Sequence, residues 1–202
     1  MSALRMARYG LWLAVAVLIV IGGTYWLTMR GGADGSSTVT SLDIGGPFKL
    51  TDQHGTTVTE ADLQGHPSAL FFGYTYCPDV CPTTLADITV WMSDLGPAAD
   101  KLKVYFITVD PERDSQEVMA NYLKAFDARI EGLTGPRPAI DQIIKDYRVY
   151  ARKVDGVNGA PYTMDHTATV YLLNDKAQFS GTIDYQEKPD IALAKLKRLT
   201  GA

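Results

Sequence analysis

The sequence predicts an α/β domain with an added N-terminal β-hairpin, preceded by one transmembrane helix. Apolar runs of strand length alternate with segments of helical periodicity over most of the 202-residue chain, a pattern typical of α/β sheets. The chain then finishes with a β-hairpin and a helix. One uncharged stretch of membrane-spanning length precedes these elements. The order of strands and helices is that of a thioredoxin-like fold.

The uncharged stretch, residues 11–29, is long enough to cross a bilayer core of roughly 30 Å as a helix. Tyrosine and tryptophan residues lie near both ends, where their rings favour the lipid headgroup region. The alternative is a cleaved signal peptide, whose apolar core would be about 7–15 residues long and would end in small residues. This stretch is longer and ends Tyr-Trp-Leu-Thr-Met, so a retained anchor is the preferred interpretation. No cysteine lies near enough to carry a lipid.

The placement of arginines predicts the topology. Arg5 and Arg8 precede the apolar stretch, and Arg30 alone closely follows it. The positive-inside rule therefore predicts a cytoplasmic segment at 1–9, a single-pass anchor at 10–29 and a periplasmic location for the rest. The expected location is the inner (cytoplasmic) membrane of a bacterium, and the mitochondrial inner membrane is the alternative.

Residues 30–45 are rich in Gly, Ser and Thr and are interpreted as a flexible linker. All 23 acidic residues lie after residue 30, so the exported part is mildly acidic. The sequence has no basic patch, charge run or low-complexity tract, which argues against nucleic acid as a partner. We expect a monomer.

The domain expected at 46–202 begins with a β-hairpin, in which 48–50 pair with 56–59 through a Gln-His-Gly turn. The next run, 68–75 (SALFFGYT), is apolar and aromatic over the length of a buried central strand. A helix is expected at 82–95, because proline favours the first helical position and a Gly-Pro pair follows the last.

A second buried strand is predicted at 102–109 (LKVYFITV). Asp114 and Glu117 then resemble a capping box before apolar residues at helical spacing, and a further helix fits 138–146. The last helix would place its apolar residues on one face. The remaining elements are strands at 147–152, 167–173 and 179–183 and this helix at 189–199.

The chain has only two cysteines, Cys77 and Cys81, in the sequence TYCPDVCPTTL. A proline follows each cysteine and biases it away from the α-region, so the helix is expected to begin at Pro82. Both sulfurs would then lie at or just before a helix N-terminus, where unpaired N–H groups and the macrodipole stabilise thiolates. Thiolate is the form that attacks disulfides and binds metal ions.

Three interpretations of this pair are open. A structural disulfide would close a very small loop and so constrain the unfolded chain little. Thiol–disulfide exchange would make Cys77 and Cys81 a redox-active catalytic pair, although redox enzymes of this fold usually separate their cysteines by two residues instead of three. Metal binding needs another ligand. A peroxiredoxin-like peroxidase would need a single thiol of unusual reactivity, so whether the protein is an enzyme stays open.

His166 is the best candidate for the further ligand among the three histidines. It lies in the sequence MDHT at the start of the predicted strand 167–173, and in a thioredoxin-like fold that loop is expected to face the start of the cysteine helix. His54, in a predicted turn, and His66, just before the strand 68–75, favour structural roles.

Two thiolates and one imidazole form a small, soft donor set that suits Cu(I) in three-coordination and also accommodates Cu(II). Structural zinc normally takes four ligands and would be one short here. Asp79, Asp165 and Met164 could each supply a fourth donor, but hydrogen bonding or packing accounts better for each. A three-ligand copper site is therefore the prediction.

These residues resemble the Sco (SenC-type) family of copper chaperones, which assist assembly of cytochrome c oxidase. GYTYCPDVCPTTL at 73–85 matches the family's CPDVCP signature, 109–114 (VDPERD) matches its VDPxRD segment, and Asp165-His166 matches its DH pair. The similarity extends from about Gly46 to the C-terminus. Thr167 departs from the pattern, where serine is expected, but both side chains carry a hydroxyl.

This resemblance implies that Cys77, Cys81 and His166 are copper ligands and that the two cysteines can oxidise to a disulfide, which abolishes the thiolate site. It implies as partners the copper-bearing subunit of cytochrome c oxidase and another copper chaperone. The protein would deliver copper to the binuclear centre; the alternative is a thiol–disulfide oxidoreductase that reduces cysteines of the oxidase or another partner. Asp110 and Asp114 would support the site from behind the ligands or cap the next helix.

Overall fold

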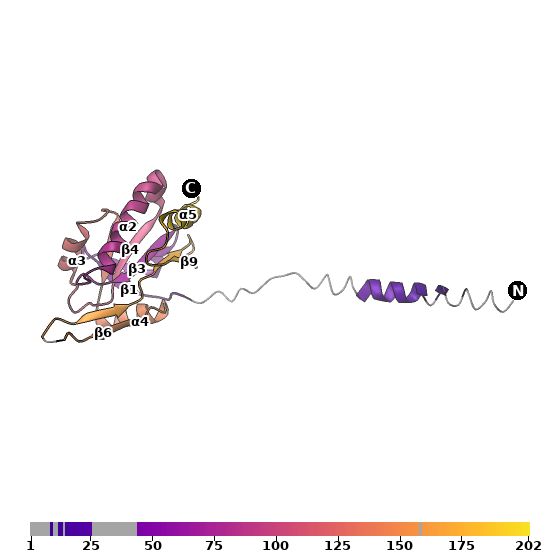
Figure 1. The fold of residues 1–202 in the computed structure, drawn as a ribbon, viewed down its shortest axis with the longest axis horizontal. Helices are drawn as coiled ribbons and strands as arrows, with labels where there is room; N and C mark the ends of the chain where they lie inside the picture. The colour runs from indigo at the N-terminus through magenta and orange to yellow at the C-terminus, as the bar shows by residue number, and fades with distance from the viewer. Residues whose placement is uncertain (1–8, 10–11, 14, 26–43, 158) are drawn as a thin grey trace. The chain divides into compact units, whose positions relative to one another are not determined.

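The structure is a computed structural model that describes residues 9, 12–13, 15–25, 44–157 and 159–202 (Figure 1). The chain divides into two compact units, Met1–Ser41 and Leu42–Ala202. Within the first unit, residues 15–25 are helical. Among the described residues, none of the helices combines the length and the apolar character that a membrane span requires.

Much of the predicted N-terminal organisation lies outside the described residues. These omit 1–8 and 26–43. The predicted cytoplasmic segment except Tyr9, the end of the predicted anchor and nearly all of the predicted linker fall there. The rest of the fold concerns the second unit.

The described residues of the second unit contain nine strands, which form two sheets. They are β1 Lys49–Asp52, β2 Thr57–Thr59, β3 Ser68–Gly73, β4 Lys103–Thr108, β5 Ile130–Thr134, β6 Ala151–Val154, β7 Thr163–His166, β8 Val170–Leu173 and β9 Phe179–Ile183. Seven of them make one sheet in the order β2-β1-β5-β4-β3-β8-β9, and β6 pairs only with β7. The centre of the large sheet, β3-β4-β5, is parallel, and antiparallel strands flank it on both sides.

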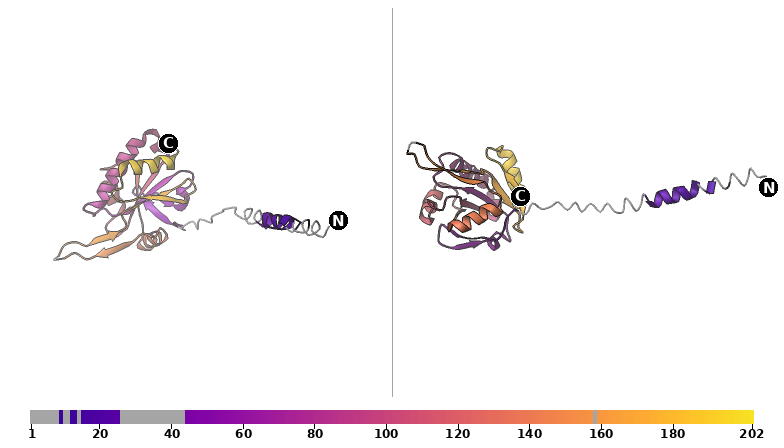
Figure 2. Two further views of the ribbon diagram at one scale, coloured as in Figure 1. Left: turned by 45° about the vertical axis from the view of Figure 1, so that its right-hand side comes forward. Right: turned by 90° about the horizontal axis from the view of Figure 1, so that it is seen from below.

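Four helices cover the large sheet. They are α2 Val80–Leu95, α3 Gln116–Leu123, α4 Arg137–Asp146 and α5 Pro189–Thr200. The crossovers β3-α2-β4 and β4-α3-β5 join parallel neighbours in the same direction, so right-handed connections place α2 and α3 on one face. Helix α5 packs beside α2 (Figures 1 and 2). On the opposite face, Tyr147 at the C-terminal end of α4 packs on Phe72 of β3, with ring centroids 5.6 Å apart.

The succession β3-α2-β4, α4, β8-β9-α5 is a thioredoxin-like core, so the thioredoxin-like α/β part of the prediction is confirmed. The predicted N-terminal hairpin is present as the antiparallel pair β1-β2. Every residue of β3 is buried, as its apolar run predicted. The α3-β5 unit and the hairpin β6-β7 are additions to this core.

Helix α2 begins at Val80, two residues before the predicted start at Pro82. Cys81 is therefore a helical residue, which corrects the expectation that it lies before the helix. Proline is tolerated in the first turn because the N–H it lacks has no intrahelical partner there. The backbone N–H of Cys81 donates instead to Cys77 Sγ, at 3.3 Å.

Strand β5 was not predicted, because its sequence IEGLT is short and interrupted by Gly132. The glycine makes room for helix α3: a Cβ there would lie 2.7 Å from Leu123 Cδ1 and 2.9 Å from Met119 Cε. The interruption that hides the strand in the sequence is thus the feature that lets the helix pack onto it.

Three further boundaries differ from the predictions. The predicted strand 147–152 is wrong for 147–149, whose backbone N–H groups donate back into α4, and for Tyr150, which bonds with Thr167 outside either strand; only its end belongs to β6. Strand β7 occupies what was expected to be a loop, and β8 begins at Val170. The N-cap of α3 is Ser115, whose side chain accepts from the Val118 N–H, so Asp114 is not the capping residue.

Candidate metal centre

Cys77, Cys81 and His166 converge on one point. Their sulfur and nitrogen ligand atoms all lie within 4.8 Å of one another, and Cys81 Sγ is 3.3 Å from His166 Nε2. Cys81 is fully buried, whereas Cys77 and His166 are half-buried. Both cysteines are free thiols. The structure thus brings together the three residues that the sequence singled out.

The two cysteines are positioned by the end of β3 and the start of α2. The Cys77 N–H donates to the carbonyl of Tyr74, at 3.3 Å, which closes the connecting loop. Gly73, the last residue of β3, lies directly behind Cys81: a Cβ there would be 2.8 Å from Cys81 Sγ and 2.6 Å from Phe106 Cε2. Only a residue without a side chain leaves room for the buried sulfur.

His166 ends strand β7 and reaches the cysteines from the other side. Its Nδ1 lies 3.0 Å from the carbonyl oxygen of Thr167, so in the neutral ring Nδ1–H donates and the Nε2 lone pair faces Cys81. The ring packs edge-on against Tyr74, with centroids 5.7 Å apart, and against Phe71. The hydrogen bond from Nδ1 and the packing against the two aromatic rings hold the imidazole in the orientation that a metal ligand needs.

The two thiols of the metal-free pair titrate in opposite directions. Hydrogen bonding from Cys81 holds the pKa of Cys77 well below its ordinary value, and burial partly opposes this effect. The pKa of Cys81 is raised, first because its thiol donates to Cys77 and then because it is buried. The expectation that both thiolates are stabilised thus holds for Cys77 alone. The two sulfurs share one proton, which stays on Cys81.

Asp114 fastens the cysteine loop to the sheet. Its fully buried carboxylate accepts from the N–H and hydroxyl of Thr75 and from the hydroxyl of Thr108. Thr75 lies two residues before Cys77. Burial raises the pKa of Asp114, and these hydrogen bonds act against the rise. Asp110 is also fully buried, but neither aspartate belongs to the group of converging ligand atoms.

The other side chains that the sequence offered as metal ligands are not part of the Cys77, Cys81 and His166 group. Asp79 is at the N-cap of α2, and Asp165 pairs with Arg152 across the hairpin, at 3.4 Å. Met164 is buried. His54 lies exposed in the β1-β2 turn, and the buried His66 Nδ1 has no hydrogen-bond partner among the described residues.

Cys77 and His166 line a pocket open to the surface, and Cys81 is not among its lining residues. Tyr74, Pro78, Val80, Met164 and Ala168 contribute apolar lining. A metal ion at the three ligand atoms would therefore be shielded by aromatic rings on one side and reachable from solvent through the pocket on the other. The sequence did not identify Gly73 and Tyr74 as residues that shape the site, although both belong to the motif 73–85.

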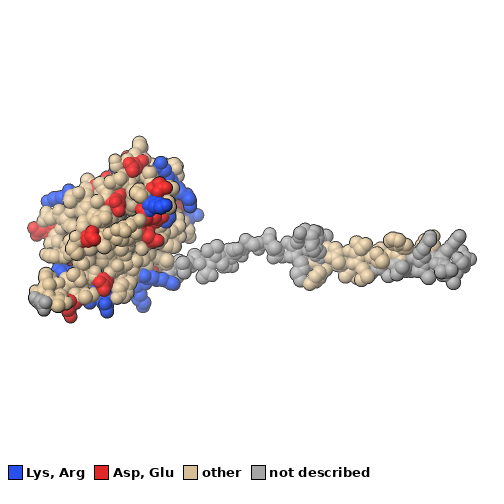
Figure 3. Space-filling model, in the orientation of Figure 1, with Lys and Arg blue, Asp and Glu red and all other residues tan. Residues whose placement is uncertain are grey.

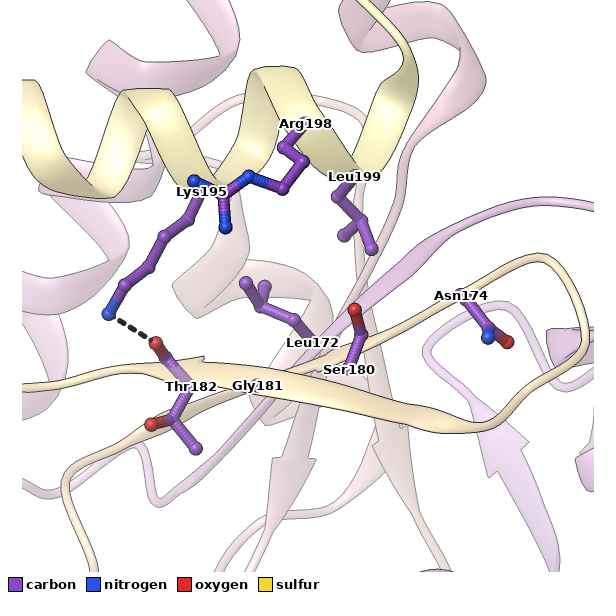
Figure 4. A pocket seen from close by; sticks show the side chains of 8 residues that line it. All are labelled: Leu172, Asn174, Ser180, Gly181, Thr182, Lys195, Arg198 and Leu199. Carbon is purple, nitrogen blue, oxygen red and sulfur yellow. Dashed lines mark hydrogen bonds between the residues drawn. The ribbon is translucent and has the colours of Figure 1, made fainter. Parts of the chain in front are cut away.

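A second pocket, drawn in Figure 4, lies between β9 and α5 and contains none of the predicted site residues. Its Lys195 donates to the carbonyl of Thr182, at 2.7 Å, and forms an ion pair with Glu187, at 2.6 Å. The charge of this lysine is therefore already compensated. Acidic and basic side chains are interspersed on the face of the domain in Figure 3.

A family model described as SCO1/SenC matches residues 36–201. The mitochondrial protein SCO2 of Saccharomyces cerevisiae is 34% identical in an alignment 204 residues long, which covers 96% of this chain and 68% of that protein. The mitochondrial SCO1 homolog of Homo sapiens is 38% identical over 144 residues, covering 70% of this chain and 47% of that protein. The chain thus spans about half to two thirds of the length of these relatives.

Solved structures agree with this similarity. Bradyrhizobium japonicum ScoI with copper bound is 49% identical with a TM-score of 0.72, and the match covers 77% of this chain and 99% of that one. Yeast Sco1 with copper bound is 33% identical with a TM-score of 0.73, covering 79% of this chain and 90% of that one.

Proposed function

The chain belongs to the SCO1/SenC family, and on this premise we propose that it is a copper chaperone that assists assembly of cytochrome c oxidase. Cys77, Cys81 and His166 bind the copper. The observation that carries the proposal is the convergence of these three ligand atoms within 4.8 Å at a pocket open to the surface. Similar structures solved with copper bound support the choice of metal.

Copper is the cargo of this site. Two sulfurs and one imidazole nitrogen are a soft set that holds Cu(I) in three-coordination, and the same set accommodates Cu(II). Binding releases the proton that Cys81 retains in the metal-free pair, so affinity falls as the pH falls. Because the metal lies beside an open pocket, the ligands of a partner displace those of this protein one at a time. The partner proposed is the copper-bearing subunit of the oxidase.

A second candidate function is reduction of a partner disulfide, favoured by the lowered pKa of Cys77. The Cys77 thiolate attacks one partner sulfur and releases the other as a thiolate. Cys81 then loses its proton and attacks Cys77 Sγ, which releases the second partner thiolate. The cysteine pair supplies two electrons and ends as a disulfide. Such a disulfide abolishes the thiolate site.

We also propose that residues 10–29 anchor the chain in the inner membrane, with the copper domain in the periplasm. The uncharged run and the arginines before it support this topology. Reporter fusions after residue 45 test it. Activity of a reporter that folds only outside the cytoplasm supports the topology, and activity of a cytoplasm-only reporter contradicts it.

Oxidase assembly in cells that lack the protein tests the main proposal. Full-length chain is expected to restore the binuclear copper centre, as measured by oxidase activity and its copper spectrum. His166→Ala, Cys77→Ser and Cys81→Ser are each expected to fail. Restoration by His166→Ala, with failure of both cysteine variants, would instead support the reductase function. Restoration by all three variants would contradict both functions.

A further inference from the structure

The hairpin β6-β7, which carries His166, is not part of the large sheet. Its strands pair only with each other, in the register Ala151↔His166 to Val154↔Thr163. Figures 1 and 2 show it projecting beside α4. Backbone pairing therefore does not fix the distance between His166 and the cysteines. Besides the short link from His166 to Val170 at the start of β8, side-chain contacts to the rest of the domain hold the hairpin in place.

One side of this hairpin faces the domain. Side chains alternate along a strand, so Met164 and His166 lie on the same side of β7. Met164 is buried in the core, and His166 lies beside Cys81. Tyr162 directly precedes β7, and its contacts show what holds the hairpin in place.

Arg113 and Asp110 hold Tyr162 at three points. The hydroxyl of Tyr162 donates to Asp110 Oδ1, at 3.0 Å. Arg113 Nη1 donates to the Tyr162 carbonyl, at 2.9 Å, and the guanidinium carbon lies 3.6 Å from the centre of the Tyr162 ring. Arg113 Nε also forms an ion pair with Asp110 Oδ2. These three residues are called the Arg113 cluster below.

Because this cluster is buried, moving the hairpin away from it would cost free energy. The Asp110 side chain is 1% exposed and that of Arg113 is 17% exposed. If the hairpin moved away, Asp110 would lose the Tyr162 hydroxyl and Arg113 would lose both an acceptor and a stacked ring. Buried charged groups that lose partners are costly. The docked hairpin is therefore the position in which the cluster is best satisfied.

We propose that the Arg113 cluster positions His166 for copper, an inference that rests on the proposed function. Two of its members, Asp110 and Arg113, belong to the segment 109–114, whose Asp114 also holds the cysteine loop through Thr75. One short segment after β4 thus joins the two parts of the chain that supply ligands. Arg113 and Tyr162 are positioning residues, because neither contributes a ligand atom.

A double-mutant cycle on copper affinity tests this role. Tyr162→Phe keeps the ring and removes only the hydroxyl; Arg113→Lys keeps the charge and removes the stacking and the bond from Nη1. Each is expected to weaken Cu(I) binding about tenfold, the cost of a lost hydrogen bond to a charged group. In a His166→Ala background, the same changes are expected to have no effect on affinity. Tyr150→Phe, at an exposed tyrosine beside the same hairpin, is the matched control and should leave affinity unchanged.

The outcomes separate this inference from the proposed function. If His166→Ala weakens binding and neither Tyr162→Phe nor Arg113→Lys does, the positioning role is wrong and the copper site stands. Equal weakening in the presence and absence of His166 would mean that the cluster acts on the general fold, which also overturns the inference. If His166→Ala itself leaves affinity unchanged, the proposed site fails first. Thermal unfolding of each variant verifies that it is folded.

Discussion

At the scale of single residues, the site depends on groups that contribute no ligand atom. Gly73 leaves the space that Cys81 Sγ occupies. Asp114 and Thr75 fix the loop before Cys77. The sequence identified the ligands because thiols before a helix and a histidine before a strand are visible as spacings. It did not identify Arg113, because its contact with Tyr162 spans 49 residues of chain.

The first prediction concerns Gly73. Gly73→Ala would place a methyl group 2.8 Å from Cys81 Sγ, so the sulfur or the helix start must move. We expect a loss of stability of about 1–3 kcal/mol together with a weakening of copper binding that is measurable by competition with a chelator. Gly132→Ala is the matched control, because it overpacks the same sheet against Leu123 and Met119. Copper affinity equal in the two variants would show that Gly73 has no special relation to the site.

The second prediction concerns the protonation of the reduced, metal-free pair. Because the pKa of Cys77 is lowered and that of Cys81 is raised, we expect one thiolate per chain throughout the neutral range. Ultraviolet thiolate absorbance against pH measures this directly. Cys77→Ser is expected to lose the neutral-range thiolate, since burial still raises the pKa of Cys81. Two thiolates, or none, at neutral pH in the unmodified protein would contradict the coupling.

The same coupling predicts how stability depends on pH. The lowered pKa of Cys77 stabilises the fold fully above the ordinary value of 9.0, and this contribution is lost as the pH falls. The raised pKa of Cys81 acts in the opposite sense and destabilises the fold as the pH rises above 9.0. The thiols should therefore give a stability maximum near pH 9.0 in denaturant titrations of the reduced domain. The rise on the acid side should be absent in Cys77→Ser.

At the scale of elements, the seven-stranded sheet with its helices and the two-stranded hairpin β6-β7 meet at the site. Cys77 lies in the loop between β3 and α2 and Cys81 in the first turn of α2, whereas His166 belongs to a two-stranded hairpin. The sequence predicted β3 and β4 because their apolar runs are continuous. It missed most of β6 and all of β7, since these short strands bury only Met164 and carry Arg, Lys and Asp. It missed β5 because of the glycine at its centre.

The fourth prediction follows from this division between the large sheet and the hairpin. Few pairings fix the hairpin, so the amides of β6 and β7 are expected to exchange with solvent faster than those of β3 and β4, whose strands are paired on both sides. Copper should slow exchange in the hairpin and leave β3 and β4 nearly unchanged, because it adds a bond between His166 and the cysteines. Hydrogen-exchange mass spectrometry with and without copper measures both effects. Equal protection of the hairpin and the central strands in the metal-free protein would contradict this picture.

At the scale of the whole molecule, the thioredoxin-like core is a support on which the site is assembled. The parallel strands end where the cysteine loop begins, and the segments after β3 and β4 meet at that edge: Val109 N–H donates to the Gly73 carbonyl, at 2.8 Å. The cysteine segment, the segment 109–114 and the histidine therefore come together from three separate parts of the chain. This arrangement explains why the motifs occur far apart in the sequence and serve one site.

The most direct test of the account is a Cu(I) titration of the reduced protein against a competing chelator without oxygen, with X-ray absorption of the product. We predict one tightly bound copper per chain with two sulfur ligands and one nitrogen ligand. Cys77→Ser, Cys81→Ser and His166→Ala should each weaken binding, and His166→Ala should remove the nitrogen ligand. Failure to bind copper tightly, or an unchanged nitrogen ligand in His166→Ala, would contradict the assignment of this site.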